Sequence, residues 1–357
     1  MRTLAAHYTN KQVMTTMPDQ TIRRPRVLVV GAGGFAGSHF VEEGLSRGYE
    51  VWAGVRQSTS RKWLTDSAIN FLTLDFDNPD TLGATLSTAL QEGEKWDYII
   101  YNLGATKCLN FADFSRINYD YLRRFTDALH TSGMEPSKML YMSSLSAVGP
   151  GDEKGYTPFT EKMIPRPNTR YGASKLKAEM WLATAGIPCV IFRATGIYGP
   201  RDHDYFLMFE SIARGFDFSV GFRKQMLSFI YADDLAKAAY DALEKAPAGE
   251  TYNIAEPHVY TQSEFRRIAA KAIGKRHVIG IRMPMWAVKA VSTVAEKLGV
   301  LRMKPSTLNR DKFNIMKQRN WSVDVSKARR DFGFEPATPL AKGVEQSVDW
   351  YRKEGWL

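Results

Sequence analysis

A tyrosine and a lysine stand four residues apart in the stretch TRYGASKLKAEMWL, residues 169–182. If this stretch is helical, Tyr171 and Lys175 lie on one face, one turn apart. A free phenol has a pKa of about 10, which is too high for a base near neutral pH. We expect the Lys175 ammonium to lower the pKa of Tyr171, so that the phenol can exchange a proton. Surface Tyr–Lys pairs at this spacing are common, so the interpretation depends on other residues.

A second candidate is the serine pair in KMLYMSSLSAVGP, residues 138–150. This stretch reads as an apolar strand that ends at Ser143 and Ser144, and Tyr171 begins a helix 27 residues after Ser144. Strand ends and the helices that follow them meet on the carboxyl side of a parallel sheet, where ligands bind. Ser144 is expected to hold a substrate oxygen and stabilise its developing charge. The trio suits hydride transfer between an alcohol and a ketone.

The glycines of VLVVGAGGFAGS, residues 27–38, indicate where a dinucleotide binds. Gly31, Gly34 and Gly37 follow an apolar strand and precede a helix that begins near Phe35 and Ala36. In that context glycines let backbone N–H groups approach a pyrophosphate at a helix N-terminus. The spacing is G-x-x-G-x-x-G, and these five residues are predicted to contact the cofactor.

Arg56 bears on which dinucleotide is bound, because it stands 19 residues after Gly37 at the end of EVWAGVR. NAD sites usually offer an acidic residue there to the ribose 2′-OH, whereas a guanidinium suits a 2′-phosphate. No acid stands beside Arg56, and Lys62 follows within reach. The prediction is that NADP(H) is preferred and NAD(H) is possible. An exposed loop charge remains the alternative for Arg56.

Two further strand ends add candidate cofactor contacts. Asp75, followed by Phe76, ends the strand in INFLTLDF, and its carboxylate can accept from the adenine amine. Leu103, Gly104 and Ala105 end the strand in WDYIIYNLGA, where small residues would let the cofactor lie close to the backbone.

Apolar strands alternate with helical patterns over the first 200 residues. A strand, a glycine-rich turn, a helix and a second strand are expected within 26–56. Further strands are expected within 69–74, 96–103, 138–144 and 189–195, and further helices within 80–91, 119–133 and 171–186. This alternation predicts an α/β fold with a doubly wound parallel sheet. The expected organisation is a polar N-terminal extension (1–24), a mainly dinucleotide-binding domain (25–200) and a mainly substrate-binding lobe (201–357) from which some elements return to the sheet.

Composition excludes several classes of protein. The chain has 357 residues, 44% of them hydrophobic, enough for a large core. Its two cysteines, Cys108 and Cys189, predict neither a disulfide framework nor a metal site, and they fit a reducing, cytoplasmic setting. The first residues lack the apolar core of a signal peptide, and no run of about 18 apolar residues predicts a transmembrane helix. The net charge is +10, but basic and acidic residues are interleaved, which argues against a nucleic-acid partner.

The apolar segment 283–303, MPMWAVKAVSTVAEKLGVLRM, has more than one interpretation. A packed amphipathic helix is the simpler one. A lid over an apolar substrate, or a helix resting on a membrane surface, is the alternative, so peripheral membrane contact stays open.

Taken together, the motifs resemble the extended short-chain dehydrogenase/reductase superfamily. The matching stretches, from about residue 26 to the end, are GAGGFAGS, YMSSLSAVGP, YGASK, FRATGIYGPRD, FIYADDLAKA and TYNIAE. The resemblance implies a Rossmann-type fold, a catalytic centre of Ser144, Tyr171 and Lys175, and a homodimer. It also implies that Asn118, in RINYDYL, supports the active-site strand and its proton-relay water. A helix-capping amide is the other interpretation of Asn118.

The substrate is harder to predict from the resemblance. Relatives that act on nucleotide sugars usually carry an asparagine where this chain has Gly196, and an arginine in the region of Leu227 and Ser228. Lys224 could partly compensate for the arginine. Other stretches resemble the 3β-hydroxysteroid dehydrogenase and dihydroflavonol reductase branches, whose substrates are largely apolar. Candidate apolar lining residues are Phe206, Met208, Phe209, Phe222, Met226, Tyr231 and Trp286.

The sequence therefore predicts an NAD(P)-dependent oxidoreductase that interconverts a secondary alcohol and a ketone on a largely apolar small molecule. One alternative is a nucleotide-sugar epimerase or dehydratase with tightly bound NAD. A second is a non-catalytic member of the fold that binds a cofactor or RNA.

Overall fold

A computed structural model describes residues 23–301 and 309–357 of the chain. Most of the predicted N-terminal extension, and the end of the 283–303 segment, lie outside these ranges. A parallel seven-stranded sheet is central, in the order β11-β6-β5-β4-β1-β2-β3. Its strands are β1 (Arg26–Val30), β2 (Glu50–Val55), β3 (Asn70–Thr73), β4 (Tyr98–Tyr101), β5 (Lys138–Met142), β6 (Cys189–Ala194) and β11 (Thr251–Ile254). The strand order reverses at β1, which is the doubly wound Rossmann arrangement, so the predicted fold class is confirmed.

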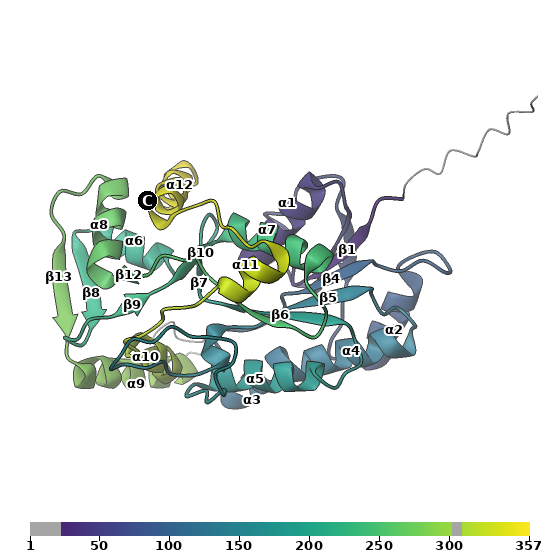
Figure 1. The fold of residues 1–357 in the computed structure, drawn as a ribbon, viewed down its shortest axis with the longest axis horizontal. Coiled ribbons are helices and arrows are strands. Elements are labelled where there is room, and N and C mark those ends of the chain that lie inside the picture. The colour runs from purple at the N-terminus through teal and green to yellow at the C-terminus, as the bar shows by residue number, and fades with distance from the viewer. Residues whose placement is uncertain (1–22, 302–308) are drawn as a thin grey trace, which may run out of the picture.

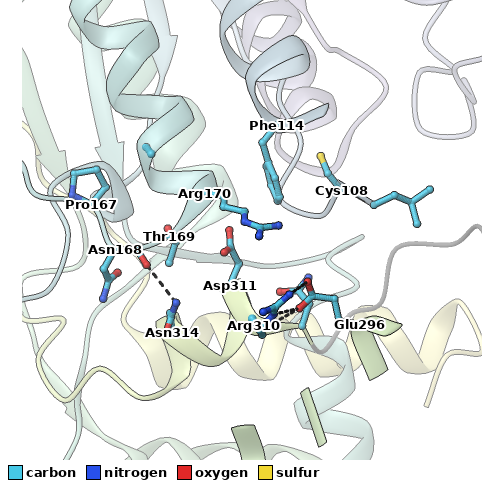
Figure 2. A pocket seen from close by; sticks show the side chains of 13 residues that line it. Cys108, Phe114, Pro167, Asn168, Thr169, Arg170, Glu296, Arg310, Asp311 and Asn314 are labelled. Carbon is cyan, nitrogen blue, oxygen red and sulfur yellow. Dashed lines mark hydrogen bonds and ion pairs between the residues drawn. The ribbon is translucent and has the colours of Figure 1, made fainter. Parts of the chain in front are cut away.

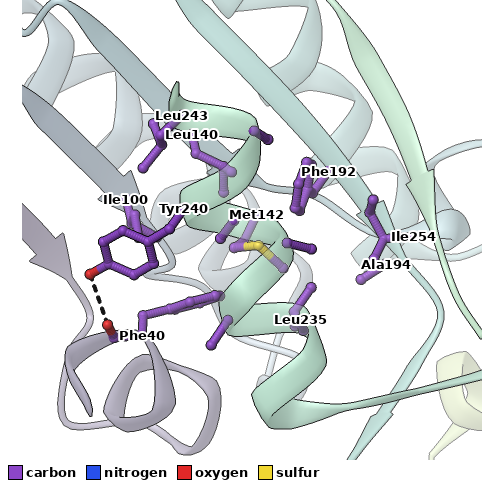
Figure 3. Close-up of a cluster of buried hydrophobic side chains, with 14 of the residues drawn as sticks. Phe40, Ile100, Leu140, Met142, Phe192, Ala194, Leu235, Tyr240, Leu243 and Ile254 are labelled. Atoms are coloured by element: carbon purple, nitrogen blue, oxygen red, sulfur yellow. Dashed lines mark hydrogen bonds between the residues drawn. The ribbon is translucent and has the colours of Figure 1, made fainter. Parts of the chain in front are cut away.

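Helices cover both faces of this sheet, which explains why most residues of its strands are apolar (Figure 1). One face carries α1 (Phe35–Ser46), α7 (Ala232–Lys245) and α11 (Ser326–Phe332), and the other carries α2 (Pro79–Thr88), α4 (Tyr121–Thr131) and α5 (Arg170–Leu182). Figure 3 shows the core on the first face, where the Tyr240 hydroxyl of α7 donates to the Phe40 carbonyl of α1 at 2.8 Å. The second core packs Leu82, Leu122 and Phe125 against the opposite face.

Three short helical segments follow strands of the sheet on its carboxyl side. They are α3 (Phe111–Ser115), the π-helical turn η1 (Arg116–Asp120) and the 3-10 turn η2 (Leu145–Ala147).

The remaining elements form what we name the outer lobe, at the end of the molecule away from α2 (Figure 1). They are β7 (Gly196–Tyr198), α6 (Phe206–Ala213), β8 (Phe216–Val220), β9 (Met226–Leu227), β10 (Phe229–Tyr231), β12 (Tyr260–Thr261), α8 (Gln262–Ile273), β13 (Ile279–Met283), α9 (Met285–Leu301), α10 (Arg310–Met316) and α12 (Leu340–Lys353). An aromatic cluster that includes Phe209, Phe229 and Phe265 holds the lobe together. Of the helices in the described ranges, none combines the length and apolar character that crossing a membrane would take.

Candidate active site

The glycine turn between β1 and α1 has the geometry of a phosphate cradle. Gly31 has φ +83°, and a Cβ there would lie 2.9 Å from the Leu103 backbone nitrogen. A Cβ at Gly37 would lie 2.2 Å from the Gly31 carbonyl oxygen, so only glycine fits. Gly34 caps α1 without a side-chain hydrogen bond, which leaves the first N–H groups, from Phe35 onward, free for an anion. The turn therefore fits a pyrophosphate.

The loop after β2 packs against this turn. A Cβ at Gly33 would lie 2.3 Å from the Thr59 methyl carbon, and the Thr59 hydroxyl accepts from the Arg56 backbone nitrogen at 3.1 Å. The Arg56 side chain is exposed beside the glycine turn. Lys62 lies instead over the Trp63 ring, 3.7 Å from the Glu354 carboxylate. Of these two cations, Lys62 makes side-chain contacts within the protein, and the Arg56 side chain is exposed.

Asp75 and Phe76 follow β3 at the same edge of the sheet but differ in exposure. The Asp75 side chain is exposed and accepts from the Asp77 backbone nitrogen at 3.0 Å. The Phe76 ring is buried and stacks on Tyr121, with the centroids 5.3 Å apart. Only Asp75 of the two presents a side chain at the surface.

Asn118 binds the segment that follows β4. Its side-chain oxygen accepts from the Ala105 backbone nitrogen at 2.7 Å, and its amide nitrogen donates to the Ala105 carbonyl at 3.0 Å and to the Ser174 hydroxyl at 2.8 Å. The side chain is fully buried in η1, and π-helical turns of this kind often occur at functional sites. Asn118 therefore joins β4 to α5, and the helix-capping interpretation does not describe these contacts.

Lys175 lies at the far end of the same line of contacts. A Cβ at Gly104 would lie 2.9 Å from the Lys175 ammonium nitrogen and 3.1 Å from the Asn118 side-chain oxygen. The preceding residue, Leu103, is the one that touches Gly31 of the glycine turn. The structure thus brings the cradle, the end of β4, Asn118 and Lys175 together along the carboxyl edge of the sheet.

Tyr171 lies in the first turn of α5, one helical turn before Lys175. Thr169 caps α5 by accepting from the Gly172 backbone nitrogen at 2.9 Å, and a Cβ at Gly172 would lie 2.1 Å from the Ser146 carbonyl oxygen. This close approach seats the first turn of α5 on η2. Burial raises the pKa of Tyr171, and a hydrogen bond with Ser144 lowers it, with the net direction upward.

That direction differs from the sequence-based expectation that Lys175 would lower the pKa of the phenol. The Lys175 ammonium donates to the Met142 carbonyl at 2.7 Å and lies over the Tyr141 ring. Burial lowers the pKa of Lys175 to about 8, while Glu179 raises it. Desolvation is therefore the largest cause at both groups: it outweighs the hydrogen bond with Ser144 at Tyr171 and the charge of Glu179 at Lys175.

Sequence reasoning missed a buried ion pair beneath the trio. Arg193 of β6 donates to Glu179 of α5 at 2.6 Å, and the Ser143 hydroxyl also donates to Glu179. Ser143 is therefore occupied in a structural contact, whereas the neighbouring Ser144 is half-exposed. Two signals could have revealed the pair: Glu179 stands four residues after Lys175, and Arg193 interrupts an apolar strand.

A cavity of about 460 Å³ lies beside α5 (Figure 2). Its lining residues are Cys108, Leu109, Phe114, Pro167, Asn168, Thr169, Arg170, Ala173, Glu296, Asn309, Arg310, Asp311 and Asn314. The lining includes neither Tyr171 nor Lys175, because it uses the outer side of the helix. Asp311 of α10 nevertheless reaches the helix start and accepts from the Tyr171 backbone nitrogen at 3.1 Å. A residue of the outer lobe thus contacts the backbone of the candidate acid.

A residue of the outer lobe, Tyr205, lies next to Gly196. A Cβ at this position would lie 2.0 Å from the Tyr205 hydroxyl oxygen, so the phenol occupies the space next to the glycine. Ser228 is 4% exposed, and its hydroxyl has no hydrogen-bond partner among the described residues. Lys224 is exposed.

The seven apolar candidates for the substrate pocket fall into three groups. Phe209 and Tyr231 belong to the buried core of the lobe. Phe206, Met208 and Met226 are partly buried. Phe222 and Trp286 are 67% and 75% exposed, so they line no enclosed pocket in this structure.

Comparisons with known proteins agree with the overall fold. Ceramide reductase of Caulobacter vibrioides is 25% identical over 339 residues, which cover 94% of this chain and 98% of that protein. Among solved structures, UDP-glucose 4-epimerase of Thermotoga maritima matches with a TM-score of 0.73 at 21% identity, covering 92% of this chain and 99% of that one. The dTDP-glucose 4,6-dehydratase of Bacillus anthracis, in complex with NAD, matches with a TM-score of 0.72 at 19% identity, covering 93% and 98%.

The sequence model of the NAD dependent epimerase/dehydratase family matches residues 27–255, which contain the glycine turn, Asn118 and the trio Ser144, Tyr171 and Lys175. The chain is an enzyme that belongs to the NAD dependent epimerase/dehydratase family, within the extended short-chain dehydrogenase/reductase superfamily.

Proposed function

We propose that this protein reduces a ketone to a secondary alcohol on a largely apolar molecule, with NADP(H) as the preferred cofactor. The observation that supports the proposal is that Lys175, on the same helix as Tyr171, lies against Gly104, and that the preceding residue, Leu103, touches the glycine turn. When bound, the cofactor supplies the hydride. Gly31, Gly34 and Gly37 hold its pyrophosphate, Asp75 its adenine, and Arg56 its 2′-phosphate.

The protein's own groups handle the proton. Ser144 holds the substrate oxygen, and Tyr171 donates its hydroxyl proton to that oxygen as negative charge develops there. Burial favours this role, because a raised pKa keeps the phenol protonated at neutral pH. Lys175 places a positive charge next to Gly104, where it stabilises the phenolate that remains after the proton is donated. These roles suit reduction better than oxidation.

The substrate we propose is a lipid-like ketone. Tyr205 fills the space beside Gly196, where an asparagine serves nucleotide sugars in the resembled relatives, and Ser228 offers no charge to a phosphate. A ceramide reductase matches nearly the whole chain, which supports an apolar substrate. We further propose that the enzyme is cytoplasmic, that it works as a homodimer, and that residues from 201 onward mainly form the substrate-binding side.

A nucleotide-sugar epimerase or dehydratase remains the second candidate, favoured by the structural similarity to enzymes of both kinds. The two candidates differ in how the cofactor is used. An epimerase regenerates its NAD in each cycle, so the purified protein would retain NAD and oxidise no added NADPH. A reductase consumes NADPH in step with ketone loss.

The decisive experiment replaces Tyr171 with Phe and measures NADPH oxidation with a long-chain ketone substrate. We expect turnover to fall by about 10²–10⁴-fold, because the proton donor is lost while the cofactor cradle is intact. Tyr101→Phe is the matched control, since the Tyr101 hydroxyl is fully buried in β4 and has no partner among the described residues. A Tyr171→Phe enzyme with more than a tenth of the wild-type rate would refute the assigned role.

Cofactor preference is tested separately by Arg56→Ala. Loss of a charge-assisted contact should weaken NADPH binding by about ten- to a hundredfold and leave NADH binding unchanged. Arg61→Ala is the control, because Arg61 lies over the Phe71 ring at 4.2 Å. Equal affinity of the wild-type enzyme for NADPH and NADH would remove the argument from Arg56.

A further inference from the structure

Exposed apolar side chains are concentrated in the outer lobe. Among the described residues, eleven large hydrophobic side chains are exposed, and nine of them lie between residues 207 and 294. They are Leu207, Phe216, Phe218, Phe222, Ile279, Met285, Trp286, Val291 and Val294. Scattered apolar residues on a surface need no explanation, but a local concentration of aromatic ones marks an interaction site.

The first part of this surface is one face of a two-stranded ribbon. The strands β8 and β13 run parallel, with Phe216 opposite Ile279 and Phe218 opposite Ile281. Residues directly opposite share a face, and the Phe216 and Phe218 rings stack with centroids 6.4 Å apart. The other face is covered by α8, whose Gln262 donates to Asp217 at 3.1 Å. No element of the described ranges covers the aromatic face at its amino end, where Phe216 and Phe218 are exposed.

At the carboxyl end of the ribbon the same surface continues into α9. Val220 and Met283 end the two strands opposite each other and pack on Val288 of α9. A Cβ at Gly221 would lie 3.3 Å from the terminal methyl of Met285, so the residues that follow both strands are in contact. Phe222 and Trp286, the next residues of the two segments, are 67% and 75% exposed. Figure 1 shows α9 crossing the end of the β8–β13 ribbon.

The charges along residues 265–295, which include β13 and the start of α9, are of one sign. No acidic residue occurs between Glu264 and Glu296. The basic residues in that interval are Arg266, Arg267, Lys271, Lys275, Arg276, Arg282 and Lys289, and all but Arg266 are exposed. Lys275 and Arg276 lead directly into the ribbon at Ile279, and Lys289 follows Trp286 by three residues.

Basic residues also flank the ribbon on the β8 side. Arg223 and Lys224 come immediately after Phe222, and both are exposed. The acid within β8, Asp217, is 4% exposed and paired with Arg266 at 3.7 Å, so it does not offset the surface charge. Apolar side chains are therefore bordered by cations at both ends of the ribbon.

We propose that this surface, the ribbon face with the start of α9, docks the enzyme on an anionic lipid bilayer. Aromatic and aliphatic side chains enter the interfacial region, and Lys and Arg pair with anionic headgroups. Neither contact requires a membrane-spanning helix. The inference goes beyond the proposed reaction, and its test does not depend on that reaction.

A second copy of the chain is the competing occupant, and charge argues against it. Two such faces brought together would place Lys275, Arg276 and Lys289 against like charges, which opposes association. An anionic bilayer supplies both an apolar interior and the complementary sign.

The test measures binding of the full-length protein to vesicles by sedimentation. Vesicles of phosphatidylcholine with 25% phosphatidylglycerol should bind the protein, and pure phosphatidylcholine vesicles should bind it at least about tenfold more weakly. Lys275→Glu with Arg276→Glu should weaken binding by more than about tenfold, because each cation near an anionic surface contributes about fivefold. Phe218→Ser with Trp286→Ser should weaken binding and leave cofactor affinity unchanged.

The matched control is Ile164→Ser with Met180→Ser, since these side chains are 75% and 66% exposed but lie outside the outer lobe. This variant should bind vesicles as the wild type does. The proposal is overturned if the wild type ignores phosphatidylglycerol vesicles, or if the control variant loses binding equally. It is also overturned if the Phe218/Trp286 variant instead dissolves a dimer seen by light scattering while vesicle binding is unchanged.

Discussion

Two arginine–glutamate ion pairs, one beneath the candidate active site and one in the outer lobe, differ in their burial and in the elements that they join. The Arg193–Glu179 pair joins β6 to α5 at 2.6 Å, with side chains 8% and 6% exposed. The Arg214–Glu210 pair is also 2.6 Å long but lies within one helical segment, with side chains 71% and 33% exposed. The first fixes the helix that carries Tyr171 to the sheet, whereas the second is a solvated surface contact.

The difference teaches where this chain places its polar groups. At the carboxyl edge of the sheet, polar side chains are buried and bonded to one another, which holds Tyr171, Lys175 and Asn118 in place. In the outer lobe, apolar side chains are exposed and charges face solvent. We propose that the first region holds the catalytic side chains in fixed positions and that the second provides the surface that binds the substrate.

The largest expected effect comes from breaking the buried pair. Glu179→Gln leaves the Arg193 cation buried without a counter-charge, which should cost about 3–5 kcal/mol of unfolding free energy. The pKa of Lys175 should also fall further below about 8, because Glu179 raises it. Denaturant titration and the pH profile of turnover measure the two effects. Glu210→Gln, in the exposed pair, should change stability by no more than about 1 kcal/mol.

The next prediction compares the stability effects of alanine substitutions at two glycines, one in the glycine turn of the candidate site and one on the surface of a helix. Gly37→Ala forces a Cβ to within 2.2 Å of the Gly31 carbonyl, so stability should fall by about 1–3 kcal/mol and dinucleotide binding should be lost. Gly83 in α2 has open space around it, and Gly83→Ala should stabilise the protein by about 0.5–1 kcal/mol. Calorimetry and cofactor titration check both. Unchanged cofactor affinity in Gly37→Ala would contradict the proposal that the glycine turn binds the pyrophosphate of the cofactor.

A pH-dependent effect is expected at the boundary between the two regions. Burial raises the pKa of Asp202 to about 7, although its carboxylate accepts from the Asp204 and Tyr205 backbone nitrogens. Between about pH 4 and pH 7 the folded protein keeps a proton that the unfolded chain loses, so stability falls as pH rises through that window. Asp202→Asn should lack this slope and should gain stability over the wild type as the pH rises from 4 to 8. Parallel melting-temperature profiles for the two proteins would contradict this assignment.

The smallest effect tests the contact between α10 and α5. Asp311→Ala removes an acceptor from the Tyr171 backbone nitrogen, while the Thr169 cap stays in place. Stability should fall by about 1 kcal/mol, and kcat should fall with little change in cofactor affinity. Asp80→Ala, in the first turn of α2, is the control and should leave turnover unchanged.

Much of the fold could be predicted because its signals are local. The apolar runs that became β1, β4, β5 and β6 are contiguous in sequence, and the glycine turn lies between one strand and one helix. Lys175 and Tyr171 share a helix, so their spacing alone aligns them. Contacts between distant segments were not predictable in this way. Tyr205 beside Gly196, Arg193 on Glu179 and Asp311 on Tyr171 each depend on how separate elements pack.

The pKa shifts of the buried groups were the other feature that the sequence could not predict. The spacing of Tyr171 and Lys175 predicts that charge lowers the pKa of the phenol, but spacing says nothing about how deeply either group is buried. In the folded protein, desolvation dominates at both residues. Burial is a property of the whole packed core, so no local pattern could have supplied it.

The five-residue turn of η1 determines the direction in which the side chains of the following helix, α4, point relative to those before it. Each residue of an α-helix advances the side-chain direction by about 100°. A one-residue deletion between 116 and 120 would restore regular α-helical winding while rotating Asn118 off the Ala105 backbone, or else displacing α4 from the sheet. This part of the chain should therefore tolerate many exchanges of side chain but no change of length.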